Sequence, residues 1–428
     1  MSAVSVFLIF IILLVLSFPI ASSLGVASLL PGAFDSSFTA SVSYVIRSML
    51  GGVDSFPLLA IPMFVLSGII MARGGVSRKL FDIFTFFIGK RRAGVPCAVI
   101  ITCLFYGAIS GSAPATVAAV GSMTIPILIN LGYDKTFSTA IVAVAGGLGV
   151  IIPPSIPYIL FSMASGESVG DLFKAGIIPG ILIAVLLMAY ASFYCRRYGE
   201  DTEKIKEVVD ILRGRGFPHL MKEGIWALLT PVIILGCIYG GIASPTEAAV
   251  ISVFYALFVS IVIYKTLKMK DIVAICSEAV RTYGPLMFIL IASTAFSRVL
   301  TLMQVPQTIS GWILDTFSGA VVIMIVINVF LLIVGMVMDT SPAILITTPI
   351  LLPIVLEIGM DPIQFGIVMV INLAIGFVTP PIGVNLFVAS SLSDIPVMEI
   401  AKKAFPLIMI FLAALLLITF IPAISLTL

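Results

Sequence analysis

Long apolar runs, separated by short polar stretches, dominate the chain from beginning to end. Apolar runs of about 18 residues or more with few charges are typical of helices that cross a membrane. Such helices satisfy their own backbone hydrogen bonds, which lipid cannot do for them. The pattern therefore predicts an all-α polytopic membrane protein, with spans at residues 4–30, 56–72, 180–195, 224–242, 246–264, 284–303, 319–338 and 404–425.

The stretches between these runs mix charged and apolar positions. Residues 35–55 predict an interfacial or tilted segment. Residues 73–92 and 265–283 are typical of amphipathic helices that lie along the membrane surface, although an ordinary loop helix explains 73–92 equally well. Residues 196–223 form the most basic loop, and we expect it on the cytoplasmic side because Lys and Arg gather there. The uncharged tail predicts a C-terminus on the other side.

Four places interrupt the apolar runs with small polar residues, glycine and proline. Two read SGSAP (110–114) and MDTSP (338–342), and the other two are 146–155, which ends in PPS, and 376–381, which ends in TPP. Backbone that leaves the helix at membrane depth persists only where protein buries it or where it lines a polar cavity. We therefore expect two re-entrant hairpins and two broken helices, and such paired breaks indicate a transporter's binding site.

The four breaks belong to an internal repeat. Residues 125–179 resemble 352–406 at a shift of 227, and SAP (112–114) matches TSP (340–342) at a shift of 228. Ordered matches over about 120 residues exceed chance even in a chain with 35 Gly and 25 Pro. Membrane repeats of this kind are often inverted around a site near the midplane. The loop at 90–92 is basic and its counterpart is not, which favours inversion.

Composition narrows the class of function. The 428 residues are 60% hydrophobic and only 10% charged, against about 25% charged in soluble proteins. A net charge of +2 gives no indication of nucleic-acid binding. Five scattered cysteines without a C-x-x-C pair argue against disulfides and zinc, and the only histidine, His219, lies in the basic loop. The N-terminus lacks a basic leader region, so we expect residues 4–30 to be retained.

The breaks supply oxygen ligands. Each hairpin would place Ser112 or Ser341 near a helix cap, followed by proline in the first turn. The positive N-terminal end of the returning helix would favour an anion. The proline pairs free nearby carbonyls, and hydroxyls with free carbonyls form an oxygen cage for a small cation. The core has almost no titratable groups, so sodium coupling is favoured over proton coupling.

Charged residues near the spans have two interpretations each. Asp339 is the one carboxylate beside a break, so it is a functional candidate, or it lies at a helix end near the headgroups. SPTE (244–247) fits a capping box, with Ser244 at the cap and Glu247 at N3, better than a functional glutamate. Three arginines near the spans could attract an anionic substrate, but side chains that reach the membrane surface explain their positions better; they are Arg47, Arg73 and Arg298. The chain has no G-x-x-x-x-G-K-[ST] phosphate loop, so transport would use an ion gradient and no enzyme activity is expected.

Four motifs, SFPLLAIP (55–62), GAISGS (107–112), SPTEAA (244–249) and TPPIG (379–383), are together similar to the large membrane subunit of tripartite ATP-independent periplasmic (TRAP) transporters. The resemblance covers nearly the whole chain. It implies two inverted repeats and an elevator-type transport domain inside a scaffold, with sodium-driven uptake of an organic-acid anion. The implied partners are a separate small four-helix membrane subunit and a periplasmic substrate-binding protein, and the implied location is the bacterial inner membrane.

The resemblance also assigns residues to the site. Sodium, the only metal and cofactor implied, would bind at Ser110, Ser112, Gly149 and Ile151 in the first repeat and at Thr340, Ser341, Gly376, Val378 and Thr379 in the second. The candidates for contacting the anion are Ser112, Ala113, Ser155, Asp339, Ser341 and Pro381. Members of this family carry C4-dicarboxylates, sialic acid or 2-oxo acids, and we slightly favour sialic acid.

The expected organisation is an N-terminal span with an interfacial segment (1–56), a first repeat (57–179), central spans with the basic loop (180–284), a second repeat (285–406) and a last span (407–428). The main alternative function is a stand-alone symporter of sodium and a divalent anion that needs no binding protein. A channel would need a continuous polar pore, whereas the polar residues here gather at the breaks. A membrane scaffold without transport has no use for paired breaks.

Overall fold

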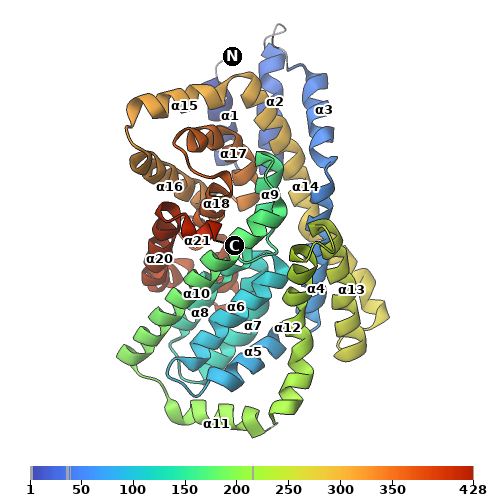
Figure 1. Ribbon diagram of the computed structural model, residues 1–428, viewed down its shortest axis with the longest axis vertical. Helices are drawn as coiled ribbons and strands as arrows, with labels where there is room; N and C mark the ends of the chain where they lie inside the picture. Colours follow the sequence, from blue (N-terminus) through green and yellow to red (C-terminus); the bar gives the residue numbers. More distant parts are fainter. Residues whose placement is uncertain (1–2, 35–37, 39, 215, 428) are drawn as a thin grey trace.

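The computed structural model describes residues 3–34, 38, 40–214 and 216–427, and every element in these ranges is helical (Figure 1). Nine of the described helices are long and apolar enough to cross a membrane. Large apolar side chains lie on the outside, including Val15, Phe254 and Phe288, whose side chains are 77%, 69% and 69% exposed. Such surface suits contact with lipid, and the all-α membrane class is confirmed.

The N-terminal part differs from the expected single span at 4–30, which is wrong. The chain forms two helices, α1 (Ala3–Val15) and α2 (Ile20–Phe34). Ser17 adopts a φ of 64° between them, and Pro19 lacks an N–H with which to continue α1. Within the expected interfacial segment, α3 (Val42–Val53) starts at a Ser41 cap, while the charge at Asp35 lies outside the described residues. A short 3₁₀ turn, η1 (Phe56–Leu59), leads into α4 (Ala60–Arg73).

The basic stretch 196–223 is not a plain loop, because it contains the helix α11 (Thr202–Gly214). Figure 1 shows α11 at the lower edge of the molecule, between α10 (Val169–Tyr198) and α12 (Phe217–Tyr239). The Arg213 side chain donates to the Phe86 carbonyl oxygen at 3.0 Å, and Lys90 forms an ion pair with Asp210. The basic segment is thereby fixed to α5 (Val76–Ile88), the expected amphipathic helix, which buries one face against α6 (Gly94–Ser110) and α12.

Two boundaries in the C-terminal half also change. The separate segments expected at 265–283 and 284–303 form one helix, α14 (Ile272–Leu302), which continues through Pro285. Neighbouring helices can compensate for the hydrogen bond that an internal proline removes. The last long helix, α20 (Val397–Phe420), begins seven residues before the expected start at 404 and ends before Pro422.

The internal repeat is visible in the order and spacing of the helices. First residues of matched helices differ by 226 (Gly94 to Ala320) to 229 (Val76 to Val305). The matched pairs are α5 with α15 (Val305–Thr316), α6 with α16 (Ala320–Val337), α7 (Ala113–Asn130) with α17 (Thr340–Glu357), α8 (Lys135–Ala145) with α18 (Pro362–Gly376), α9 (Ile156–Ser165) with α19 (Val384–Ser393), and α10 with α20. At the same spacing α3 and α4 together match the single helix α14. The similarity between the repeats therefore begins before residues 57 and 285, where the two repeats were expected to start.

The two repeats interlock. Helix α9 of the first repeat packs on α17 of the second, and α19 packs on α7 and α8. The Asn385 side-chain amide donates to the Ala143 carbonyl oxygen at 3.1 Å, across this contact. Figure 1 shows α10 running diagonally between the lower, blue-green part and the upper, orange-red part. The broken segments of both repeats therefore lie in one continuous packed core.

Helix α13 (Pro245–Phe258) begins with the expected capping box, which is confirmed. The Ser244 hydroxyl accepts from the Glu247 N–H at 3.3 Å, and the Glu247 carboxylate accepts from the Ser244 N–H at 2.8 Å. We expect Ser244→Ala to lower the free energy of unfolding by about 1 kcal/mol, the usual effect of losing a helix cap. Thermal unfolding in detergent would measure this, with Ser244→Thr as the control that keeps the cap. An unchanged midpoint for Ser244→Ala would contradict the role of the cap.

Candidate functional site

The tip of the first hairpin is a tight turn between α6 and α7. Gly111 adopts a φ of 62°, a left-handed conformation that glycine reaches without a steric penalty. Ser112 is the N-cap residue of α7 and Pro114 lies in its first turn, as expected. The Ser110 hydroxyl donates to the Ser112 carbonyl oxygen at 3.3 Å and accepts from the Ser112 N–H at 3.4 Å. Two of the predicted sodium ligands therefore lie together at this tip.

The broken helix of the first repeat reaches the same tip. After α8 the chain forms a 3₁₀ turn, η2 (Gly146–Val150), and then a non-helical segment that leads to α9. A Cβ atom on Gly149 would lie 2.8 Å from the Ser112 carbonyl oxygen, and one on Gly111 would lie 3.0 Å from the Pro154 carbonyl oxygen. The Ile156 N–H also donates to the Gly111 carbonyl oxygen at 3.4 Å. The structure thus brings Gly149 together with Ser110 and Ser112.

Two other predicted residues of this repeat are placed less centrally. The Ile151 carbonyl oxygen lies 2.9 Å from the position of a Cβ atom on Gly176, so it faces α10. Ser155 is buried, and its hydroxyl donates to the Val150 carbonyl oxygen within the broken segment.

Thr116, a residue that the sequence reasoning missed, joins this cluster. Its buried hydroxyl donates to the Ser112 carbonyl oxygen at 2.8 Å and lies 3.0 Å from the Ser110 hydroxyl oxygen. A Cβ atom on Gly149 would lie 2.4 Å from the same hydroxyl. A threonine one helical turn after the cap, inside an apolar run, was the available signal.

The second hairpin has a different cap. Asp339, not Ser341, is the N-cap residue of α17, and its carboxylate accepts from the Ser341 N–H at 3.0 Å. Ser341 lies near the cap, as expected, with Pro342 in the first turn, and the preceding aspartate supplies the cap itself. Asp339 therefore has a local structural role beside the break. Thr340 and Ser341 lie buried in the first turn of α17.

The second broken helix contacts its hairpin through glycine. A Cβ atom on Gly376 would lie only 2.3 Å from the Gly335 carbonyl carbon, where α18 crosses α16. Val378 is buried, and the Thr379 hydroxyl donates to the Ile375 carbonyl oxygen at 2.8 Å. In the first repeat, a Cβ atom on Gly107 would lie 2.6 Å from the Gly149 Cα. Both repeats thus use a pair of glycines to bring hairpin and broken helix together, which the sequence comparison also missed.

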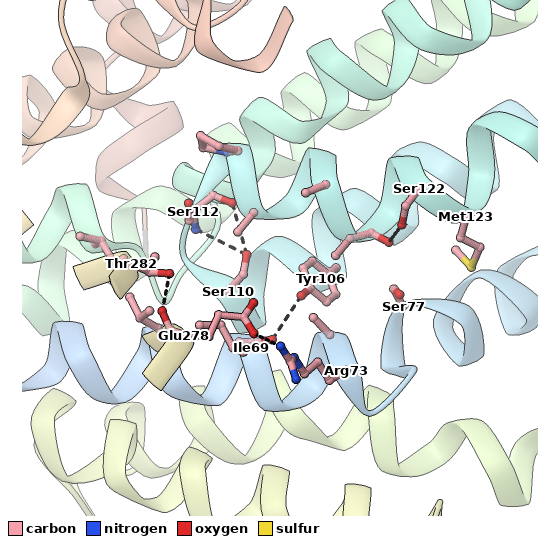
Figure 2. Close-up of a pocket in the computed structure, with 18 of the residues that line it drawn as sticks. Ile69, Arg73, Ser77, Tyr106, Ser110, Ser112, Ser122, Met123, Glu278 and Thr282 are labelled. Carbon is pink, nitrogen blue, oxygen red and sulfur yellow. Dashed lines mark hydrogen bonds and ion pairs between the residues drawn. The ribbon is translucent and has the colours of Figure 1, made fainter. Parts of the chain in front are cut away.

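A cavity of about 760 Å³ adjoins the first tip. It lies between α4 and α14 on one side and α6 and α7 on the other, and we name it the Ser110 cavity. Figure 2 shows Ser110 and Tyr106 on α6 facing α4, and Arg73 at the end of α4 forms an ion pair with Glu278 of α14. Among the six candidate anion contacts only Ser112 lines this cavity, whereas Ala113, Ser155, Asp339, Ser341 and Pro381 do not. Of the three arginines, Arg73 lines the cavity, while Arg47 is exposed on α3.

The Ser110 cavity lies on the same side as the basic segment. Its lining includes Ser77 and Arg78 of α5, the helix to which α11 is fixed. The Arg78 side chain donates to the Asp82 carboxylate at 3.1 Å. The positive-inside rule predicts that this side faces the cytoplasm.

Comparison with known proteins places these features in context. Residues 7–424 match the model of the family described as "Tripartite ATP-independent periplasmic transporter, DctM component". The chain is 43% identical over 418 residues to the isethionate TRAP transporter permease protein DctMQ of Oleidesulfovibrio alaskensis, covering 97% of this chain and 64% of that longer protein. It is 40% identical to the C4-dicarboxylate TRAP transporter large permease protein DctM of Pseudomonas aeruginosa, covering 88% and 86% of the two chains. It is 35% identical to the 2,3-diketo-L-gulonate TRAP transporter large permease protein YiaN of Escherichia coli, covering 89% and 88%.

Solved structures show the same fold at low sequence identity. The YdaH transporter of Alcanivorax borkumensis superimposes with a TM-score of 0.65 at 13% identity, covering 97% of both chains. MtrF of Neisseria gonorrhoeae superimposes with a TM-score of 0.59 at 15% identity, covering 97% of this chain and 94% of that one. The fold is therefore that of membrane transporters.

Proposed function

Because the chain belongs to the tripartite ATP-independent periplasmic transporter family, as its large permease component, we propose that it takes up an organic-acid anion driven by a sodium gradient. Transport permeases of this family are not enzymes, so the chain's task is to bind, move and release its cargo. The bacterial inner membrane is the location that such a family implies.

The observation that carries sodium coupling is the oxygen cluster of the first hairpin. The Ser110 hydroxyl, the Ser112 carbonyl and the Thr116 hydroxyl converge within hydrogen-bond distance of one another, beside the backbone of Gly149. Neutral oxygens suit a hard monovalent cation, whereas protons need a titratable group. Among the described residues no group of three or more His, Cys, Asp or Glu side chains could hold a metal ion. Thr116 is a better third ligand than Ile151, whose carbonyl faces α10.

The second repeat would hold sodium in a related way. Thr340 and Ser341 at the tip and Gly376, Val378 and Thr379 at the broken helix are the proposed ligands. The close approach of Gly335 and Gly376 supports this assignment, because it keeps the hairpin beside the break. Two matched ion sites would couple the repeats to one gradient.

The mechanism that we propose is an elevator. Helices α4 and α14 would belong to the stationary scaffold, and the hairpins with the broken helices would move as one interlocked body. The Ser110 cavity supports this division, since it separates α4 from α7 and is lined in part by α5, to which the basic segment is fixed. In the proposed inverted arrangement this cavity is the cytoplasmic release path.

The substrate class rests on the relatives. Their names specify isethionate, C4-dicarboxylates and 2,3-diketo-L-gulonate, which share an acidic group. We propose a small carboxylate or sulfonate anion, with sialic acid and 2-oxo acids included among the compounds to be tested. A periplasmic binding protein would deliver the anion, and a small membrane subunit would complete the permease.

The decisive experiment reconstitutes the chain with its small subunit in liposomes, adds candidate binding proteins and measures uptake of radiolabelled anions. We expect uptake that requires an inward sodium gradient and a loaded binding protein. Uptake that persists at equal sodium concentrations would contradict the coupling. Uptake by the chain without any binding protein would favour the alternative, a stand-alone symporter of sodium and a divalent anion.

A further inference from the structure

A second cavity lies between α14 and α17, with α3 and α9 completing its lining. It measures about 270 Å³, and we name it the Arg298 cavity. Helix α14 contributes Thr294, Ser297 and Arg298, and Ser55 adds a third hydroxyl from the segment after α3. A Cβ atom on Gly51 would lie 3.6 Å from a terminal guanidinium nitrogen of Arg298, so the guanidinium lies over the backbone of α3. The cavity combines three hydroxyls with one cation.

The Arg298 cavity occupies the position in the second repeat that the Ser110 cavity occupies in the first. Each cavity lies between a scaffold helix and the returning helix of a hairpin, α14 and α17 here and α4 and α7 there. The correspondence extends to single residues of the two linings, since at shifts of 227 or 228 Leu345 matches Ala118, Pro349 matches Ser122, and Ser297 matches Ile69. The two cavities are therefore related by the repeat.

The two cavities differ in packing. Helix α14 packs closely on α17, which leaves the small Arg298 cavity, whereas α4 barely contacts α7 and leaves the larger Ser110 cavity. Related segments in two arrangements are what an alternating-access transporter needs, with one path open while its counterpart is closed.

The two cavities also differ in charge. In the Ser110 cavity both arginines are paired with carboxylates, Arg73 with Glu278 and Arg78 with Asp82. In the described part of the chain Arg298 forms no ion pair, and no acidic residue lines its cavity. An unpaired guanidinium attracts an anion more strongly than a paired one, and it can bind a carboxylate or sulfonate with two parallel hydrogen bonds.

We propose that the Arg298 cavity is the capture site for the acidic group of the substrate, on the side opposite the Ser110 cavity. Arg298 donates to the carboxylate or sulfonate, and the hydroxyls of Ser297 and Ser55 complete the site, while the Thr294 hydroxyl donates to the Leu290 carbonyl oxygen. The anion is then captured where the arginine is unpaired and released where the arginines are already neutralised. This proposal rests on the proposed function, because it takes the two cavities as the two ends of one transport path.

The first test measures the electrostatic field of the cavity without transport. Ser297→Cys, in a background with Cys276→Ser to remove the exposed native thiol, would be labelled in reconstituted permease with two reagents of similar size. One is anionic, sulfonatoethyl methanethiosulfonate, and the other is its cationic trimethylammonium analogue. Labelling of the same background without the change at Ser297 is subtracted. No binding protein is added, so docking does not affect the result.

We expect Arg298→Gln to lower the ratio of anionic to cationic labelling rates at position 297 by about tenfold, the effect of removing one nearby charge. Arg298→Lys should keep most of the ratio. The matched control is Ser122→Cys in the Ser110 cavity, where Arg298→Gln should change nothing. Equal changes for both reagents, or an unchanged ratio, would overturn the proposal.

The second test measures uptake. Arg298→Gln should raise the concentration of loaded binding protein that gives half-maximal uptake at least about tenfold, while the sodium dependence stays as in the unaltered chain. Normal half-saturation would overturn the capture site. If the unaltered chain transports none of the tested anions, the proposed function fails, and the labelling ratio still decides whether the cavity attracts anions.

Discussion

Gly376→Ala is expected to reduce uptake to background. The new methyl group would lie 2.3 Å from the Gly335 carbonyl carbon, much closer than two non-bonded carbon atoms can approach. The obstacle is backbone and not a flexible side chain, so α16 and α18 must separate. Separation would pull the second hairpin away from its broken helix and open the proposed sodium cage. We expect a destabilisation of about 3 kcal/mol, at the upper end for overpacked sites. Initial uptake rates and thermal unfolding in detergent would measure both effects.

The control for this prediction is a glycine at which an added methyl group would contact no other atom. Gly284 lies within α14, and a Cβ atom there would have no neighbour within 4 Å. Gly284→Ala should keep uptake and raise helix stability slightly, because alanine favours helix more than glycine does. Gly107→Ala should resemble Gly376→Ala, since its methyl group would lie 2.6 Å from the Gly149 Cα. Normal uptake by Gly376→Ala would show that the glycine contact is not needed for transport.

The sequence predicts the places where helices break because local chemistry decides them. Clusters of glycine, proline and small polar residues favour a break in a helix, and the structure has non-helical segments at Ser112, at 151–155, at Met338 and at 377–383. The prediction for 4–30 failed because Ser17 and Pro19 lie in a run whose average hydropathy is high, which hides a turn. At α17 the sequence places Ser341 near the cap, as the structure has it, but Asp339 and Ser341 are both good caps and only the fold selects Asp339.

The contacts between segments could not be predicted in the same way. Thr116 bonds to Ser112 locally, but its approach to Gly149 depends on how α8 returns past the hairpin. Gly107 and Gly335 occupy matching positions of the two repeats, but many glycines match by chance. Their importance appears only in the structure, where Gly107 contacts Gly149 and Gly335 contacts Gly376. The sequence explains Arg298 as a side chain that reaches the membrane surface. Only the relation of the two cavities by the repeat suggests that it binds an anion. Long-range packing thus supplies what periodicity and motifs omit.

Thr116→Val is expected to raise the sodium concentration for half-maximal uptake by about tenfold. The change keeps the side-chain shape and removes the hydroxyl that lies 2.8 Å from the Ser112 carbonyl oxygen and 3.0 Å from the Ser110 hydroxyl. Loss of one polar interaction with an ion corresponds to about 1.5 kcal/mol, which is about tenfold in affinity. Uptake measured across a series of sodium concentrations would give the shift.

The matched control for Thr116→Val lies on the same helix. Thr124 is also buried, and its hydroxyl donates to the Val120 carbonyl oxygen at 2.8 Å, four residues back, as that of Thr116 does to Ser112. Thr124→Val removes the same kind of bond far from the tip, so it should change stability and leave sodium dependence unchanged. Thr116→Ser keeps a hydroxyl at the tip, so it should keep normal sodium dependence. If Thr116→Val and Thr124→Val have the same effect on sodium dependence, the Thr116 hydroxyl serves only as a hydrogen-bond donor to the Ser112 carbonyl oxygen. A shift confined to Thr116→Val would instead assign the hydroxyl to the ion, because backbone satisfaction is the same at both positions.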